Sequence, residues 1–287
     1  MDNRQNSANI NWYPGHMAKT KREIKEKLPL VDLVYEVVDA RMPSASKIKD
    51  LEDVIKNKPK LLIMTKYDLC DEEITNKFIK KYENEGYTVI AVDLISGKNV
   101  QKIISVTNEI MQKQNEERRK KGLKSRNIRV LIVGVPNVGK STLINRLVSK
   151  KVSQTGNRPG VTKSLSWIRI HKNIDLLDTP GILWPKLENQ DEAHTLAALS
   201  SIKEEILNME DICQYVVSKM IKYYPTQFIT RYKLDNIDND FATLCENIAK
   251  VRGCYLKKGE IDYDKVYSIV INDLKEGKLG NITFDRI

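Results

Sequence analysis

The residues from Gly134 to Ser141 have the spacing of a loop that binds phosphate. They fit the pattern G-x-x-x-x-G-K-[ST], with a β-branched run at 128–133 before them and a helical pattern from Lys140 onward. Backbone N–H groups and a helix N-terminus would then face the phosphates. Lys140 would reach the β- and γ-phosphates and assist catalysis, and Ser141 would bind Mg²⁺. The predicted nucleotide contacts in this loop are Asn137, Val138, Gly139, Lys140, Ser141 and Thr142.

A second motif, Asp-Thr-Pro-Gly at 178–181, follows a predicted strand at 174–177. Asp178 is predicted to hold Mg²⁺ through water. The N–H of Gly181 would meet the γ-phosphate, which gives it both a binding and a catalytic role. Thr162 lies on the connection between the two motifs, where its hydroxyl would complete the Mg²⁺ coordination only when a γ-phosphate is present. This predicts a segment that orders and disorders with the nucleotide.

The sequence Thr65-Lys66-Tyr67-Asp68 follows a predicted strand at 60–64 and resembles the guanine motif [NT]-K-x-D. A carboxylate at Asp68 would accept hydrogen bonds from N1–H and the N2 amino group of guanine. Adenine offers neither donor in that arrangement, so ATP would be rejected. Lys66 would lie along the purine plane, and Thr65 completes the predicted base site. GTP and GDP are therefore the expected nucleotides.

The order of these motifs is unusual, because the base motif precedes the phosphate loop. Short apolar runs alternate with helical patterns, which predicts a parallel α/β sheet. The fold prediction is a P-loop GTPase sheet with circularly permuted motif order, in which residues 100–127 join the original ends. Helical patterns alone follow, which predicts a GTPase domain at 1–195, with an N-terminal arm at 1–30, and an all-helical domain at 196–287. The predicted strands are 33–38, 60–64, 87–92, 128–133, 165–170 and 174–177.

Taken together, the motifs resemble those of circularly permuted ribosome-biogenesis GTPases, most closely the RbgA/YlqF family. The resemblance implies GTP hydrolysis coupled to late assembly of the large (50S) ribosomal subunit. It implies as partners the precursor of that subunit and its rRNA, contacted by the C-terminal helical domain. The matching segments are Trp12 to Lys19, Asp39-Ala40-Arg41-x-Pro43, Thr65 to Asp68, Gly134 to Thr142, Asp178 to Gly181, Ile182 to Lys186, and Lys250-x-Arg252-Gly253-Cys254.

Four residues and one position after the D-T-P-G motif bear on how GTP would be hydrolysed. Ile182 stands where Ras-type enzymes place a water-orienting Gln, so hydrolysis by the isolated protein should be slow and stimulated by the ribosomal subunit. The resemblance implies that the Asn137 side chain holds K⁺ near the phosphates. His16 could orient or deprotonate water, or could instead serve in packing or RNA contact. Asp39 and Arg41 either brace the site or cap a strand end.

The net charge of +10 is unevenly distributed. Residues 130–174 contain eight basic side chains and no carboxylate, whereas residues 205–287 are balanced to −1. Lys140 is assigned to GTP, and the others are predicted to contact the RNA backbone, so that the GTPase domain supplies much of the salt-dependent affinity. These predicted RNA-contacting residues are Arg146, Lys150, Lys151, Arg158, Lys163, Arg169 and Lys172.

Composition and the pattern of cysteine and apolar residues limit the kinds of protein this sequence could encode. The four cysteines have no C-x-x-C spacing, the N-terminus is polar, and no stretch of 18 residues is apolar and uncharged. We expect a cytoplasmic protein, monomeric in solution, with no membrane segment. A small-subunit assembly GTPase is an alternative, but permuted GTPases of that kind carry a β-barrel and a zinc module that this sequence lacks. A GTP-gated RNA-binding module with little turnover is the other alternative.

Overall fold

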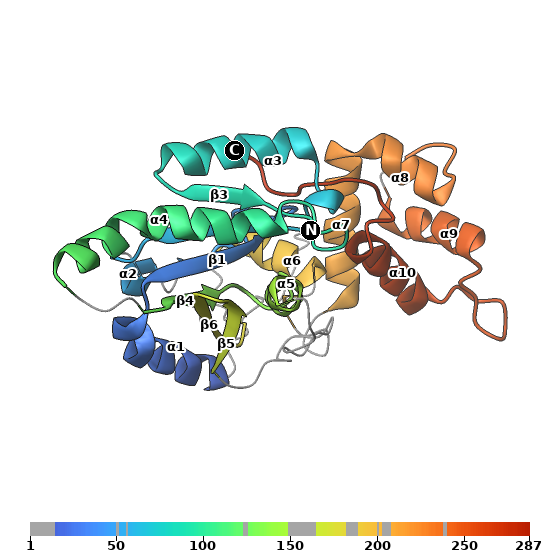
Figure 1. The fold of residues 1–287 in the computed structure, drawn as a ribbon. Helices are drawn as coiled ribbons and strands as arrows, with labels where there is room; N and C mark the ends of the chain where they lie inside the picture. Colours follow the sequence, from blue (N-terminus) through green and yellow to red (C-terminus); the bar gives the residue numbers. More distant parts are fainter. Residues whose placement is uncertain are drawn as a thin grey trace.

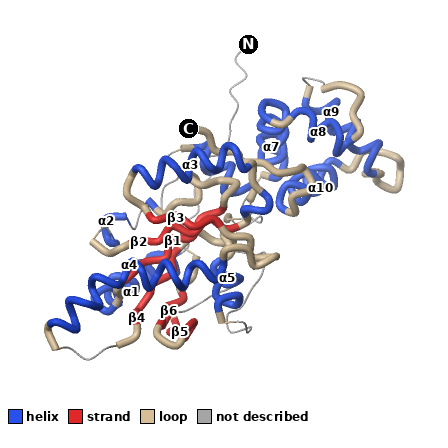
Figure 2. The backbone as a smooth tube through the Cα atoms, turned by 45° about the horizontal axis from the view of Figure 1, so that its top comes forward, coloured by secondary structure: helices blue, strands red, loops and turns tan. Residues whose placement is uncertain are grey.

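The computed structural model describes residues 15–49, 52–55, 57–122, 126–148, 165–181, 189–199, 201–202, 208–237 and 240–287; the side chains of residues 15 and 16 are not described. At its centre is a six-stranded sheet of order β3-β2-β1-β4-β6-β5, enclosed by helices (Figures 1 and 2). Neighbouring strands are parallel, except that β5 runs antiparallel to β6 at the edge. The strands are β1 Leu33–Asp39, β2 Lys60–Thr65, β3 Thr88–Ala91, β4 Ile128–Val133, β5 Ser166–His171 and β6 Ile174–Asp178.

All six predicted strands are confirmed, and no strand end differs from its prediction by more than one residue. The central strands are apolar on both faces because helices cover both sides of a parallel sheet, and every residue of β1 is buried. The sheet also confirms the permuted order. The strand that carries the base motif, β2, precedes β4, which leads into the phosphate loop. The helices of this part are α1 Gly15–Lys27, α2 Glu52–Ile55, α3 Glu72–Asn84, α4 Val100–Lys120 and α5 Lys140–Leu147.

The segment predicted to join the original ends consists mostly of α4, which is an integral part of the fold. Ile103 and Met111 of α4 are buried in the main hydrophobic core. The hydroxyls of Tyr35 on β1 and Thr107 on α4 lie 2.5 Å apart in a buried hydrogen bond. The linker is therefore packed against the sheet it connects, and burial removes the Tyr35 hydroxyl from water and raises its pKa.

Between β1 and β2 the described residues contain one short α-helix. Its described part, α2, has four residues, and residues 50, 51 and 56 lie outside the described ones. Residues 40–47, directly after β1, form turns. The Ser46 hydroxyl donates to the carbonyl of Met42 (2.6 Å) and accepts from the amide of Asp39 (3.0 Å). These local bonds give the backbone an alternative to a helix.

The C-terminal part is helical, as predicted, and Pro225 separates two helices by starting the second. Asn208, Asp240 and Asp262 cap the first turns of α7, α9 and α10 with side-chain oxygens. Helix α10 packs against α7 and α9, and α6 packs against α7. The boundary between residues 195 and 196 stays a prediction. These helices are α6 Gln190–Ala198, α7 Met209–Tyr223, α8 Pro225–Tyr232, α9 Phe241–Arg252 and α10 Tyr263–Lys275.

The chain does not end within this helical group. After α10 it returns to the sheet, and Figure 1 places the C-terminus beside α3. The amide of Ile282 donates to the carbonyl of Leu69 (3.1 Å), and that of Phe284 donates to the carbonyl of Arg41 (2.8 Å). The Asp285 carboxylate accepts from the amide of Ser44 (2.6 Å), and burial raises its pKa to about 6. This return was not predicted, and it ties the helical part to the loops that follow β1 and β2.

Two negative findings concern the described residues alone. No helix among them has both the length and the apolar character needed to cross a bilayer. Nor do they contain a group of three His, Cys, Asp or Glu side chains placed to hold a metal ion. All four cysteines are described, and each is a buried free thiol.

Candidate guanine-nucleotide site

The phosphate loop connects β4 to α5 as predicted. Asn137 (φ 60°) and Gly139 (φ 99°) both have left-handed backbone conformations, which a tight loop around phosphates requires. Gly134 is needed for a different reason. A Cβ there would lie 2.6 Å from the carbonyl oxygen of Val37 on the neighbouring strand. The glycines of the motif thus serve both the turn and its close packing on the sheet.

The Lys140 side chain lies inside this loop. Its ammonium donates to the carbonyls of Gly134 and Val135, each at 2.9 Å, and the residue is 7% exposed. Burial lowers the pKa of Lys140 to about 8, an effect that the nearby charge of Asp178 opposes. The loop therefore holds a cation that a phosphate group would stabilise in its charged form.

The D-T-P-G turn packs directly on the phosphate loop. Asp178 ends β6 and is 2% exposed, and the Thr179 hydroxyl donates to the carbonyl of Ile132 on β4 (2.7 Å). A Cβ on Gly181 would lie 2.7 Å from the backbone N and Cα of Pro136. Only glycine fits at that distance, so the turn and the phosphate loop form one surface. Ile182 and Thr162 lie outside the described residues.

The base motif contacts the same loop from the other side. The Thr65 hydroxyl donates to the carbonyl of Val138, and the Lys66 ammonium donates to the carbonyl of Asn137 (2.9 Å). Lys66 has a left-handed backbone (φ 57°) and turns the chain at the end of β2. Two segments that lie far apart in the sequence are thereby joined by direct hydrogen bonds, because the carboxyl ends of parallel strands meet at one edge of the sheet.

Asp68 lies in a 3₁₀ turn at Tyr67–Leu69 and is partly exposed. Burial raises its pKa, and the negative charge of Asp93 adds to that effect. The carboxylates of Asp68 and Asp93 lie close enough to interact. The base motif therefore lies near the loop at residues 93–98, which we call the base-side loop. A guanine that donates to Asp68 would stabilise its ionised form and oppose both effects.

The base-side loop is held in place by its own hydrogen bonds and by α5. Two of its amides already have an acceptor, because Oδ1 of Asp93 accepts from the N–H of Ile95 (2.7 Å) and of Ser96 (3.2 Å). Arg146 on α5 holds the loop from the phosphate side. Its guanidinium donates to the carbonyls of Leu94 (2.7 Å) and Ile95. Arg146 was predicted to contact RNA, but its donors are directed to this loop.

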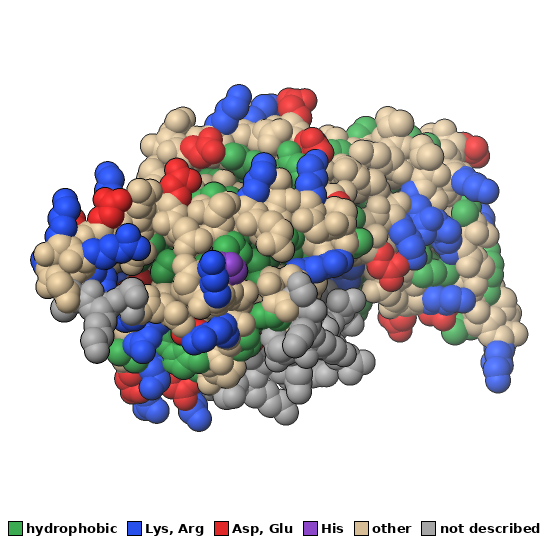
Figure 3. Space-filling view, viewed as in Figure 1, with side chains coloured by type: hydrophobic (Ala, Val, Ile, Leu, Met, Phe, Trp, Pro, Cys, Tyr) green, Lys and Arg blue, Asp and Glu red, His purple; other side chains and the backbone are tan. Residues whose placement is uncertain are grey.

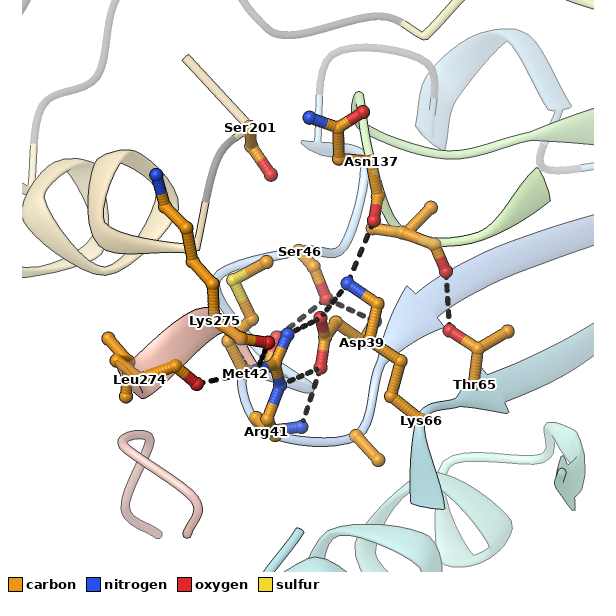
Figure 4. A network of polar contacts seen from close by, with 12 residues as sticks. Asp39, Arg41, Met42, Ser46, Thr65, Lys66, Asn137, Ser201, Leu274 and Lys275 are labelled. Carbon is orange, nitrogen blue, oxygen red and sulfur yellow. Dashed lines mark hydrogen bonds and ion pairs between the residues drawn. The ribbon is translucent and has the colours of Figure 1, made fainter. Parts of the chain in front are cut away.

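A buried charge network lies behind the base motif (Figure 4). Asp39 is fully buried, and its carboxylate accepts from Arg41 Nε (3.0 Å) and Nη2 (2.9 Å) and pairs with the Lys66 ammonium (2.9 Å). Burial alone would raise the pKa of Asp39, but the two cations outweigh it and hold the pKa well below its usual range. Of the two roles considered for Asp39 and Arg41, this contact with Lys66 favours bracing of the site.

A further contact with the loop comes from the connection between α6 and α7. The Ser201 hydroxyl donates to the carbonyl of Pro136 (2.9 Å), and Ser201 is fully buried. The sequence contains no signal for this bond, because any buried hydroxyl could make it with any carbonyl. It joins the phosphate loop to the segment that leads into the C-terminal helices.

The structure thus brings most of the predicted site together. Thr65, Lys66, Asn137 and Val138 are in direct contact, and Gly139, Lys140, Asp178 and Gly181 line the same edge of the sheet. Ser141 and the exposed Thr142 begin α5. His16 lies in the first turn of α1, but its side chain is outside the described part of the chain.

Comparisons with known proteins agree with this geometry. A family model described as "50S ribosome-binding GTPase" matches residues 129–252. A protein of Priestia megaterium named ribosome biogenesis GTPase A is 44% identical over 277 residues, which are 96% of each chain. The chain belongs to the ribosome biogenesis GTPase A family. A relative of the same name from Thermotoga maritima is 31% identical, over 96% of this chain and 94% of its own.

Two solved structures of YlqF from T. maritima match over nearly the whole chain. The GNP-bound structure has a TM-score of 0.69 at 28% identity, covering 93% of this chain and 98% of that one. The GDP-bound structure has a TM-score of 0.68 and covers 92% and 99%. The family, the permuted sheet and the nucleotide motifs together make this protein a GTPase.

Proposed function

We propose that this GTPase is an assembly factor that acts in late maturation of the large ribosomal subunit and binds its rRNA. The observation that carries the proposal is the direct bonding of the base motif to the phosphate loop through Thr65 and Lys66, in a chain of this family. The description of the matching family model, a 50S ribosome-binding GTPase, favours the large subunit over the small one.

In the proposed site, GTP lies across the carboxyl edge of the sheet. Asp68 accepts from guanine, and Lys66 lies along the ring. The N–H groups of residues 137–142 and the Lys140 ammonium hold the phosphates. Gly181 and Thr162 respond to the γ-phosphate, and release of that phosphate frees the segments they belong to. Gly181 packs on Pro136 of the phosphate loop, and Ser201 donates to the carbonyl of the same residue. These contacts support a link between the γ-phosphate and the segments that contain Gly181 and Ser201.

The donor set fits Mg²⁺. Asp178 supplies a buried carboxylate at the end of β6, and Ser141 follows Lys140 at the start of α5. Oxygen ligands of this kind, completed by phosphate oxygens and water, are those that Mg²⁺ prefers. Thr162 would add its hydroxyl when a γ-phosphate is present. The ion would neutralise charge on the β- and γ-phosphates, which favours hydrolysis.

His16 is the proposed water-orienting residue, because Ile182 cannot hydrogen-bond to water. The His16→Ala protein should bind GTP normally and lose most of its subunit-stimulated turnover, by about 100-fold, as expected for a general base. Full stimulated turnover in this variant would exclude the role. Normal GTP binding is the internal control, because a damaged fold would lose both properties.

Two surfaces of the described structure are suited to RNA. On the GTPase part, the Arg129 guanidinium lies 5.8 Å from the ring centre of Trp167, which is 42% exposed on the edge strand β5. On the helical part, a hairpin between α9 and α10 presents Tyr255 (45% exposed) and Leu256 (50%) next to Lys257 and Lys258. Figure 3 shows basic side chains on both parts of the face in view. Exposed aromatic rings beside cations stack on unpaired bases and contact phosphates.

Co-sedimentation tests the choice of partner. With a non-hydrolysable GTP analogue, the protein should pellet with immature large subunits but not with small subunits. Without nucleotide, it should pellet with neither. Binding to small subunits instead would favour the small-subunit alternative. Tight binding to the large subunit without any multiple turnover of GTP would favour the RNA-binding module that is gated by nucleotide.

A further inference from the structure

The buried charge network continues from the guanine site to the end of α10. Arg41 is 2% exposed and has three groups of donors. Nε and Nη2 bind the two oxygens of Asp39, and Nη1 donates to the carbonyls of Leu274 (3.2 Å) and Lys275 (3.3 Å). Figure 4 shows Arg41 between the Asp39 carboxylate and these carbonyls. One guanidinium therefore bridges the end of β1 and the last turn of a helix more than 200 residues later.

The chemistry of each contact explains why arginine occupies this place. The last carbonyls of a helix lack partners within the helix and carry the negative end of its dipole, so a cation there is stabilising. A guanidinium can bind a carboxylate with two parallel N–H groups and still direct a third outward. A lysine ammonium has a single charged nitrogen and cannot span both groups.

The other side of Asp39 reaches the base motif. Lys66 pairs with the same carboxylate oxygen that accepts from Arg41 Nη2, and its ammonium also donates to Asn137 in the phosphate loop. Burial lowers the pKa of Lys66, the charge of Asp39 opposes this, and the charge of Arg41 adds to it. Arg41 and Lys66 share the Asp39 carboxylate. The position of the Lys66 ammonium therefore depends on the hydrogen bonds that Arg41 makes to the same carboxylate.

We propose that Arg41 is a positioning residue that couples the guanine site to the C-terminal helices. It acts through Asp39 to keep the Lys66 ammonium beside the phosphate loop, and through Leu274 and Lys275 it makes that position depend on the docking of α10. Guanine nucleotide and docked α10 then stabilise one another. The proposal rests on the assignment of Lys66 to the guanine site in the proposed function.

The test uses the full chain and the substitutions Arg41→Lys and Lys66→Met. Lys66→Met and the double variant each keep one cation beside the buried Asp39, and Arg41→Lys keeps two. With a fluorescent GDP, Lys66→Met should weaken binding by about 30-fold and Arg41→Lys by about fivefold. The double variant should bind no more weakly than Lys66→Met alone, because Arg41 acts through Lys66. Independent effects, whose product appears in the double variant, would overturn the proposal.

Arg231→Lys is the matched control. Arg231 on α8 forms an equivalent forked ion pair with Asp273 on α10 (2.8 and 2.7 Å), one residue before the carbonyls that Arg41 binds. It stabilises the same helix without reaching the guanine site. Its substitution should leave GDP affinity within about twofold of the parent. An effect as large as that of Arg41→Lys would mean that any loosening of α10 weakens the site, which contradicts a specific role for Arg41.

Hydrogen exchange gives a second readout. The amides of Gly277 and Lys278 bond to the last turn of α10, at Leu274 and Asp273. GDP should slow their exchange severalfold in the parent and in Arg231→Lys, but not in Arg41→Lys. Equal protection by GDP in Arg41→Lys and the parent would overturn the coupling. If Lys66→Met leaves GDP affinity unchanged, the base-site assignment itself fails, which is a distinguishable result.

Discussion

The phosphate side and the base side of the nucleotide site are built in different ways. On the phosphate side, one continuous segment from β4 to α5 holds its own lysine, and Lys140 bonds to carbonyls five and six residues before it. On the base side, Lys66 is held by Asp39 and Asn137, while Arg41 and Arg146 reach to the end of α10 and to the base-side loop. The lysine of the phosphate side is held within its own loop, although that loop also contacts Ser201 and Gly181. The lysine of the base side is held by groups from segments far apart in the sequence.

This difference leads to unequal expectations. A substitution of Lys140 should act on the binding of GTP and GDP, because its hydrogen bonds stay within the phosphate loop. A substitution on the base side should also change how the nucleotide affects distant parts of the chain, because the contacts there extend to α5 and α10.

The largest effect is expected for Asp68→Asn on the base side. The asparagine side chain would have an amide N–H donor in place of one carboxylate oxygen. That donor can pair with the C2 carbonyl of xanthine but not with the N2 amino group of guanine. Affinity for GDP should fall by about 100-fold or more, and affinity for the xanthosine diphosphate should rise. Competition binding with both nucleotides measures this. Unchanged preference for guanine would remove Asp68 from the base site.

The next prediction concerns Asn137, where the two sides meet. Its carbonyl faces Lys66, whereas its side chain points away from that network (Figure 4). We propose that the side chain helps to hold K⁺ near the phosphates, which would replace the charge of an arginine finger. GTP turnover should be about tenfold faster in KCl than in NaCl at constant ionic strength. Equal rates in the two salts would exclude the role.

A smaller effect is expected from pH on the phosphate side. The pKa of Lys140 is about 8 in this structure, and the charge of bound phosphate should raise it. At least one pH unit below 8 the lysine is protonated with and without nucleotide, so affinity is constant there. Above pH 8, binding must take up a proton, and GDP affinity should fall by about fourfold at pH 8.5 with uptake of about 0.7 proton. Calorimetry in buffers of different ionisation enthalpy measures the proton uptake. The absence of proton uptake at pH 8.5 would contradict the lowered pKa of Lys140.

The smallest effect is expected for the RNA-binding charges, which belong to neither side of the site. Lys172 is exposed after β5, and Lys150 and Lys151 lie outside the described residues. Replacing all three by Gln should reduce the slope of log affinity against log salt for subunit binding by about two to three. GDP affinity is the control and should not change. A slope equal to that of the parent would place the RNA contacts elsewhere, with the hairpin after α9 as the next candidate.

The difference between local contacts and contacts across the fold also explains which features could be predicted from the sequence. The strands, the phosphate loop and the D-T-P-G turn were predictable, because apolar runs and glycine positions report local structure. The contacts of Arg41 with Leu274, Arg146 with Leu94 and Ser201 with Pro136 were not. Each ends on a backbone carbonyl, which every residue has, so the residue type of the acceptor carries no signal. The return of residues 282–286 to the sheet was missed for the same reason, since its bonds are mostly to main-chain groups.

The proposed action of this GTPase on the large ribosomal subunit can be tested by its hydrolysis rates. Multiple-turnover GTP hydrolysis would be followed for the protein alone, with purified large subunits and with purified small subunits, in the same KCl buffer. We expect slow hydrolysis by the protein alone, stimulation by large subunits of at least tenfold, and no stimulation by small subunits. Equal rates in all three reactions, or stimulation by small subunits only, would contradict the proposal.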